Sequence, residues 1–168
     1  MVEGVCMVKE NLNRQELIEK IESIGMYIDD MLKRYYKICD MKQVAEIIKE
    51  NVCEIDYDFL GFLYQYESLS KLIPKDWTIV DLGCSSGFQA EYFKTHKKYI
   101  GIDVDDRLKY QTSNAEYHTM RIKDFLESEN FKDLDLSKTF AICNYVPCEI
   151  EVEMARIKFK NIFVYYPG

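Results

Sequence analysis

The sequence lacks any apolar segment near the roughly 20 residues needed to span a bilayer, because Lys and Glu interrupt every candidate. Its six cysteines form no C-x-x-C pair, and neither His96 nor His118 lies at zinc-ligand spacing from them. Basic residues are also few, with 22 Lys and Arg against 29 Asp and Glu and a net charge of −7. These shortages argue against a membrane-spanning protein, a metal site and nonspecific binding to nucleic acid or anionic membranes.

The chain also lacks the apolar core of a secretory signal peptide at residues 1–9, so we expect a cytoplasmic protein with free thiols. What it has is a hydrophobic content of 48% in 168 residues. That is enough to fill the core of one domain, or of one small domain with an appendage.

The first part of the sequence predicts helices. Apolar residues recur at three- and four-residue intervals over 13–39, where Gly25 interrupts the pattern, and Asp40 is suited to cap a second helix that continues to about residue 48. Residues 54–72 predict a third helix rich in aromatic side chains. Pro74 ends this pattern, so we divide the chain into a helical segment, 1–73, and a second part, 74–168.

The second part predicts alternating strands and helices. The expected strands are 78–82, 98–103, 115–120, 140–144 and 161–166, with helices at 88–94, from Asp124 onward, and at 150–158. Alternation of this kind indicates an α/β fold with a parallel, doubly wound sheet and helices on both faces. We expect the Rossmann-like strand order 3-2-1-4-5.

One motif indicates a nucleotide-type cofactor. The first strand runs into the loop 83–87, which Gly83 and Gly87 flank, and the second strand ends at Asp103, 20 residues after Gly83. Asp81, two residues before Gly83, would repel the pyrophosphate of a dinucleotide. This acid therefore argues against NAD.

The sequence Asp81-Leu82-Gly83-Cys84-Ser85-Ser86-Gly87, followed by Gly101-Ile102-Asp103, resembles the first two motifs of class I S-adenosylmethionine-dependent methyltransferases. The resemblance implies that Asp81 organises the site for the ammonium group of S-adenosylmethionine and that Asp103 accepts bonds from both ribose hydroxyls. The family usually has glycine at position 85, where this chain has Ser85. The resemblance spans about residues 76–168 and leaves the catalytic residue unassigned. The cofactor-binding residues that it implies are Asp81, Gly83, Cys84, Ser85, Gly87, Asp103, Val104, Asp124, Phe125 and Asn144.

Several of these residues also suit a purely structural role. Cys84 is a small residue that a tight turn tolerates. Asp124 and Phe125 match an adenine-binding pair of the family, but equally suit the first turn of a helix and a core anchor. Asn144 begins Asn144-Tyr145-Val146-Pro147, which keeps only the Asn of the motif found in amine and amide methyltransferases, and it also suits a polar strand end.

The family sheet usually ends in a further C-terminal hairpin, for which this sequence has no strands. The fifth strand should then be an edge, covered by the N-terminal helices or by a second copy in a homodimer. In the family, an N-terminal helical segment often forms a lid, and Tyr64 or Tyr66 could serve there, although aromatics at helical spacing are more often core.

Three functions remain open. The first is a methyltransferase that transfers the methyl group of S-adenosylmethionine to a small molecule or protein. The second is a noncatalytic relative that serves as a binding or assembly subunit. The third, an NAD-linked oxidoreductase, requires that Asp81 point away from the ligand.

Overall fold

The structure is a computed structural model that describes residues 37–50, 57–144 and 146–165, without the side chains of Ile48 and of residues 57–64. The predicted helix over 13–39 lies mostly outside these residues. The elements are α3 (Met41–Glu50), α4 (Tyr57–Leu72), β1 (Thr78–Leu82), the 3₁₀ helix η1 (Phe88–Phe93), β2 (Lys98–Asp103), β3 (Ala115–Thr119), α5 (Ile122–Leu126), α6 (Glu129–Lys132), the 3₁₀ helix η2 (Leu136–Lys138), β4 (Thr139–Asn144), α7 (Glu149–Lys158) and β5 (Ile162–Tyr165).

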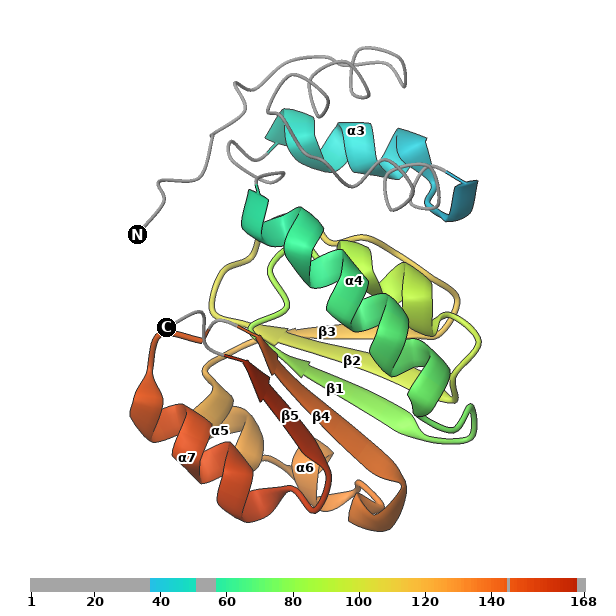
Figure 1. Ribbon diagram of the computed structural model, residues 1–168. Helices are drawn as coiled ribbons and strands as arrows, with labels where there is room; N and C mark the ends of the chain where they lie inside the picture. The colour runs from blue at the N-terminus through green and yellow to red at the C-terminus, as the bar shows by residue number, and fades with distance from the viewer. Residues whose placement is uncertain (1–36, 51–56, 145, 166–168) are drawn as a thin grey trace.

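The five strands form one parallel sheet in the order β3-β2-β1-β4-β5 (Figure 1). This confirms the fold class and the strand order predicted from the sequence. Strand β1 lies at the centre, and Asp81 pairs with Gly101 on one side and Ile142 on the other. Because the order reverses between β1 and β4, a crevice is expected at the carboxyl ends of these strands.

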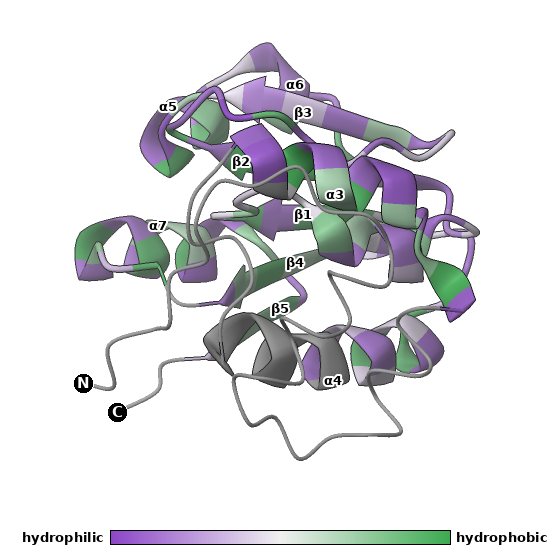
Figure 2. Ribbon diagram, turned by 90° about the horizontal axis from the view of Figure 1, so that it is seen from above, coloured by the Kyte–Doolittle hydropathy of each residue, from purple (hydrophilic) through white to green (hydrophobic). Residues whose placement is uncertain are grey.

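Helices cover both faces of the sheet (Figure 1). On one face, α3, α4 and η1 share an apolar cluster with residues such as Ile79, Tyr99 and Ile142. On the other face, α5, α6 and α7 pack on alternate residues of the same strands, such as Val80 and Ile100. Hydrophobic colour dominates β4, whereas α7 alternates between hydrophobic and hydrophilic residues (Figure 2). The strands are thus buried on both faces, as expected of a parallel sheet.

The helical segment is fastened to the sheet domain by polar contacts as well. Asp40 caps α3 as predicted, because its carboxylate accepts bonds from the backbone amides of Lys42 and Gln43. The backbone amide of Asp40 in turn donates to the Tyr110 hydroxyl at 2.7 Å. Gln43 exchanges two hydrogen bonds with the backbone of Gln111. These contacts hold the first turn of α3 against the loop between β2 and β3.

Some element boundaries differ from the sequence prediction. Asp124 does not open its helix: α5 begins two residues earlier, where Ile122 enters the core. The helix after β1 is a 3₁₀ helix, and α6 and η2 were not predicted. Within the part of the chain that the structure describes, no helix is long and apolar enough to cross a membrane.

Candidate functional site

The loop after β1 is a tight turn with three residues in the left-handed region: Gly83 at φ 78°, Ser85 at φ 54° and Gly87 at φ 74°. The backbone amides of Gly83 and Cys84 both donate to the carbonyl of Ile102, at 2.7 and 3.1 Å. The loop is therefore fixed to β2. Ser85 adopts a positive φ that glycine accepts readily and that a residue with a Cβ adopts at some conformational cost.

The glycines also have a packing role. A Cβ at Gly87 would meet the Tyr117 hydroxyl oxygen at 2.5 Å, and one at Gly101 would meet Tyr117 Cδ1 at 2.6 Å. A Cβ at Gly83 would meet Val146 Cγ2 at 2.9 Å. Neighbouring side chains therefore require glycine at all three positions, and a positive φ requires it at Gly83 and Gly87 as well.

Asp103 ends β2 beside this loop. Its Oδ2 accepts a bond from the Ser85 amide at 2.8 Å, and its Oδ1 accepts one from the Asp105 amide at 3.3 Å. Each carboxylate oxygen has a second acceptor position, so the half-buried group retains capacity for two hydroxyl donors. The structure therefore brings the loop and Asp103 together as the sequence suggested.

The loop after β2 folds against Ser85. Arg107 Nη1 donates to Ser85 Oγ at 3.1 Å, and Lys109 Nζ donates to the Ser85 carbonyl at 2.7 Å. Both cations also pair with the Asp105 carboxylate. Val104 in this loop is 65% exposed, so its side chain is available to contact a ligand.

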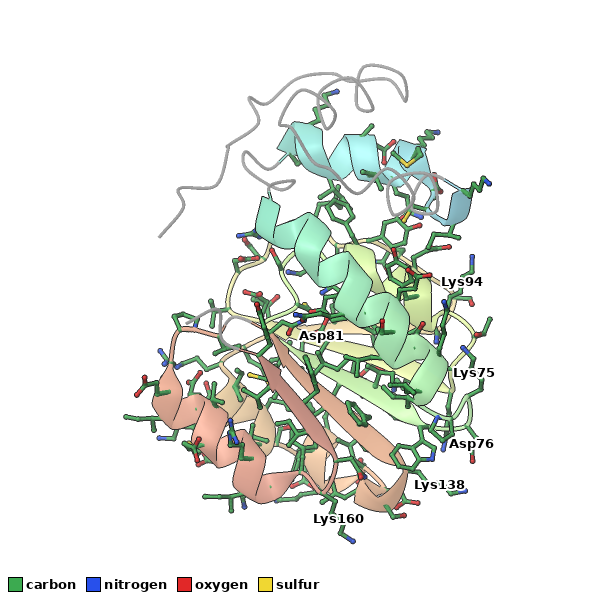
Figure 3. All side chains as sticks on the ribbon, viewed as in Figure 1. Lys75, Asp76, Asp81, Lys94, Lys138 and Lys160 are labelled. Atoms are coloured by element: carbon green, nitrogen blue, oxygen red, sulfur yellow. The ribbon has the colours of Figure 1, made fainter. Side chains whose placement is uncertain are left out.

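Asp81 is fully buried under the helices of the α4 face (Figure 3). Tyr99 and Gln89 donate to its Oδ2 at 2.5 and 2.6 Å, and Tyr66 lies 3.4 Å from its Oδ1. Burial raises the pKa of Asp81 to about 6, although these three bonds act in the opposite direction. The carboxylate is therefore mostly ionised at pH 7 and is held by neutral donors.

Two polar side chains near the loop are buried without hydrogen bonds. Among the described residues, neither amide atom of Asn144 at the end of β4 has a hydrogen-bond partner, and neither does Ser86 Oγ. The Asn144 amide lies near the Tyr66 hydroxyl, but the contact does not meet hydrogen-bond geometry. Burial raises the pKa of Tyr66, and the nearby amide offsets part of that rise. Buried polar groups of this kind usually have a partner, so these atoms are suited to contact a bound molecule.

Three other predicted site residues differ in burial. Cys84 is fully buried, with Sγ beside Gly101, and burial raises the pKa of its thiol well above the ordinary value. Phe125 is also fully buried, 6.0 Å from Phe131 between ring centroids, so its ring occupies the core-anchor position and does not reach the loop. Asp124 is exposed in the first turn of α5.

Sequence reasoning did not assign the side chains that surround Asp81. Gln89 and Tyr99 read as ordinary helix and strand residues, and no motif marks them. Tyr66 is one of several aromatics in its helix, and the sequence indicates only a lid residue or, more often, a core residue there. The side chain of its companion in that prediction, Tyr64, is outside the described residues. The period-two alternation of β2 could have placed Tyr99 on the same face as Asp103, but not against Asp81.

A separate cavity of about 570 Å³ lies between the start of α3, the end of η1 and the loop 110–113. Glu91, Lys94 and Tyr110 line it, and none of the predicted site residues does. In the described ranges, no group of three or more His, Cys, Asp and Glu side chains could hold a metal ion. Cys84, Cys143 and Cys148 are free thiols.

Comparison with known proteins adds two distant structural similarities. No family model matches the chain, and no curated protein matches it. One solved structure, "a Putative Type II Methyltransferase from Anaeromyxobacter dehalogenans", shares 14% identity at a TM-score of 0.43 over 59% of this chain and 42% of that one. Another, "a putative methyltransferase from streptococcus mutans in complex with SAH", shares 16% identity at a TM-score of 0.42 over 59% of this chain and 65% of that one.

Both neighbours are described as methyltransferases, the class whose first two motifs the sequence resembles. This chain spans less than two thirds of the length of either protein. At these scores the similarities do not indicate what this chain binds.

Proposed function

We propose that the chain binds S-adenosylmethionine at the loop 83–87 and transfers its methyl group to a small-molecule or protein acceptor. The observation that carries the proposal is the hydrogen bond from the Ser85 amide to Asp103, which joins the two motifs into one site. In this proposal, residues 74–168 bind the cofactor and residues 1–73 act as a helical cover, consistent with α4 lying over one sheet face.

The residues present fit this cofactor. Asp103 has acceptor positions left for ribose hydroxyls, and Asp81 supplies negative charge near the loop for a cationic ligand. The unpartnered amide of Asn144 offers a donor and an acceptor at the neighbouring strand end. When bound, S-adenosylmethionine supplies a methyl group already activated by its sulfonium. The chain then mainly has to bind, orient and shield the reactants.

A second candidate is a noncatalytic protein that binds the cofactor without methyl transfer. The observation that favours it is the sequence after Asn144, where Tyr145 and Val146 stand in place of the prolines of the amine and amide methyltransferase motif. The cofactor-binding half of the proposal is common to both candidates. They differ only in turnover.

Thermal melts with S-adenosylmethionine, S-adenosylhomocysteine and NAD test the binding half. A ligand at 100 times its dissociation constant stabilises the native state by about 2.7 kcal/mol, which is readily measured. We expect stabilisation by the first two ligands only. Stabilisation by NAD alone would replace the proposal with the oxidoreductase alternative.

Transfer of a labelled methyl group from S-adenosylmethionine to components of a cell extract then separates the two remaining candidates. We expect labelled product with the full chain and none with Asp103→Ala under the same conditions. Cofactor binding without any transfer would favour the noncatalytic candidate.

A further inference from the structure

The two carboxylate oxygens of Asp81 are bound unequally. Oδ2 accepts short bonds from Tyr99 in β2 and Gln89 in η1. For Oδ1, Tyr66 is the donor that the described residues supply, and its hydroxyl is 3.4 Å away. A bond of that length is weak, so Oδ1 retains most of its acceptor capacity. Tyr66 belongs to α4, so the buried acid is contacted by the helical segment as well as by the sheet domain.

Asn144 lies on the same side of the sheet as Asp81. Asp81 pairs with Ile142, and side chains two residues apart on a strand share a face, which places Asn144 one step further toward the carboxyl edge. Asn144 is 5% exposed, and within the described ranges its amide has no partner that meets hydrogen-bond geometry, although it is near the Tyr66 hydroxyl. A buried polar group without a partner indicates a position at which a ligand atom can complete the bonding.

We propose that Tyr66 is a positioning residue for the ligand: its hydroxyl orients Oδ1 of Asp81 and the Asn144 amide toward a primary ammonium group. The inference rests on the proposed function, because S-adenosylmethionine and S-adenosylhomocysteine carry such a group. A carboxylate oxygen and an amide oxygen are both acceptors for ammonium protons, and Tyr66 can also accept one. The helix α4 would thereby contribute to cofactor recognition.

The groups that face Asp81 make its ionisation sensitive to Tyr66. Burial raises the pKa of Asp81 to about 6, and the bond from Tyr66 is one of three that hold it down. The ionisable groups near Asp81 in the described part of the chain are the Asp103 carboxylate and several buried phenols and thiols. Burial raises the pKa of each of these phenols and thiols. These neighbours are Tyr99 and Asp103 in β2, Tyr117 in β3, Cys143 in β4, and Cys84 in the loop. Removal of the Tyr66 hydroxyl should raise the pKa of Asp81 toward neutrality.

Calorimetric titration of the full chain with S-adenosylhomocysteine between pH 6 and pH 8 tests the inference. For Tyr66→Phe we expect a severalfold loss of affinity at pH 6 and a smaller loss at pH 8, because a raised Asp81 pKa leaves less of the carboxylate ionised at the lower pH. The matched control is Tyr92→Phe. Tyr92 lies in η1 and packs in the same apolar cluster as Tyr66, but its hydroxyl is not a donor to Asp81. We expect this control to follow the wild type.

A second probe, 5′-methylthioadenosine, has the nucleoside and the thioether but no ammonium group. Its affinity should be unchanged by Tyr66→Phe at every pH. Equal losses for both probes would show a merely structural role and overturn the inference, as would unchanged binding of S-adenosylhomocysteine. If the wild-type chain binds neither probe, the proposed function fails first.

Asn144→Ala keeps the inference testable even if Tyr66→Phe does not fold. Among the described residues the amide has no partner that meets hydrogen-bond geometry, so its removal should cost less stability than the loss of a bonded buried amide, and a thermal melt checks that the variant folds. We expect the affinity for S-adenosylhomocysteine to fall about fivefold, which corresponds to one neutral hydrogen bond, and the affinity for 5′-methylthioadenosine to stay constant. Wild-type affinity for both probes would overturn the inference.

Discussion

The backbone amide of Ser85 donates to Oδ2 of Asp103 at 2.8 Å, so the loop that follows β1 is bonded to the carboxylate that ends β2. The two residues are 18 positions apart in the sequence and come together because β1 and β2 are adjacent parallel strands. The left-handed backbone of Ser85 turns its amide toward the acid. This bond is the structural basis for treating the two motifs as one ligand site.

Gly87→Ala should destabilise the fold by about 2–4 kcal/mol, because a Cβ there is strained at φ 74° and overlaps Tyr117. Gly101→Ala meets the same ring without a positive φ and should cost less. Urea unfolding measures both. In a Tyr117→Val background, the cost of Gly101→Ala should shrink, and strict additivity of the two changes would contradict the packing role of Tyr117.

The buried acid Asp81 should make stability depend on pH. Its folded pKa of about 6 lies above the ordinary value of 3.8, so the native state holds this proton more tightly than the unfolded chain does. The Asp81 contribution is fully present below pH 4 and is lost as the pH rises toward 6, by about 3 kcal/mol in total.

Unfolding free energies of wild type and Asp81→Asn across pH 4 to 7 measure this contribution, because other groups titrate alike in both proteins. We expect the stability of the wild type relative to the variant to fall over this range. A difference that stays constant with pH would show that Asp81 has an ordinary pKa.

Tyr110→Phe should loosen the attachment of the helical segment. The Tyr110 hydroxyl donates to the buried Glu91 carboxylate at 2.7 Å and accepts from the Asp40 amide at 2.7 Å. Its removal leaves both groups without this partner, at a cost of about 2–3 kcal/mol. Chemical denaturation measures this cost. The same measurement applies to Gln43→Ala, which breaks the two contacts to the Gln111 backbone and should cost about 1 kcal/mol. A neutral Tyr110→Phe would contradict this account.

The two edges of the sheet differ in a way that predicts self-association. Edge strand β3 carries Glu116, which pairs with Lys98 and His118, whereas β5 has the uncharged sequence Ile162-Phe163-Val164-Tyr165. In the described residues, β5 pairs with β4 alone, and α3 and α4 cover a sheet face. An uncharged edge favours pairing with another strand.

Light scattering should therefore show a concentration-dependent dimer of the full chain. Tyr165→Lys, which introduces a charge at the 36% exposed end of this edge, should shift it toward the monomer. A charge added at the β3 edge, Thr119→Lys, is the control and should leave the mass unchanged. A wild-type monomer at all concentrations would show that β5 is not an interface between copies.

Sequence patterns predicted the sheet well because β1, β2, β4 and β5 are short, largely apolar segments, Gly83 follows β1 and Asp103 ends β2. The strand 78–82 has the predicted bounds, and the order follows from the handedness of crossovers. Short helices such as α6 were missed, because four residues carry no periodic signal. Asp124 was placed at a helix start, but the burial of Ile122 two residues earlier decides where α5 begins.

Site residues could be predicted from the sequence only where the local backbone conformation restricts which residue type can stand there. Gly83, Gly87 and Asp103 stand at turns and strand ends, where residue type is tied to conformation or exposure. The partners of Asp81 come from three separate elements, and no local pattern links Tyr66 or Gln89 to it. Phe125 could not be assigned for a different reason. A phenylalanine suits both a ring-stacking site and the core, and the structure places it in the core.

Calorimetric titration with S-adenosylhomocysteine decides whether the loop 83–87 and Asp103 form one cofactor site. The account predicts saturable binding to the full chain that Asp103→Ala weakens by about 2–3 kcal/mol, or roughly 30- to 150-fold, because the carboxylate makes charge-assisted bonds to the ribose. The exposed Asp106→Ala in the same loop should bind as the wild type does. Absence of binding to the wild type, or equal binding to a folded Asp103→Ala protein, would contradict the claim.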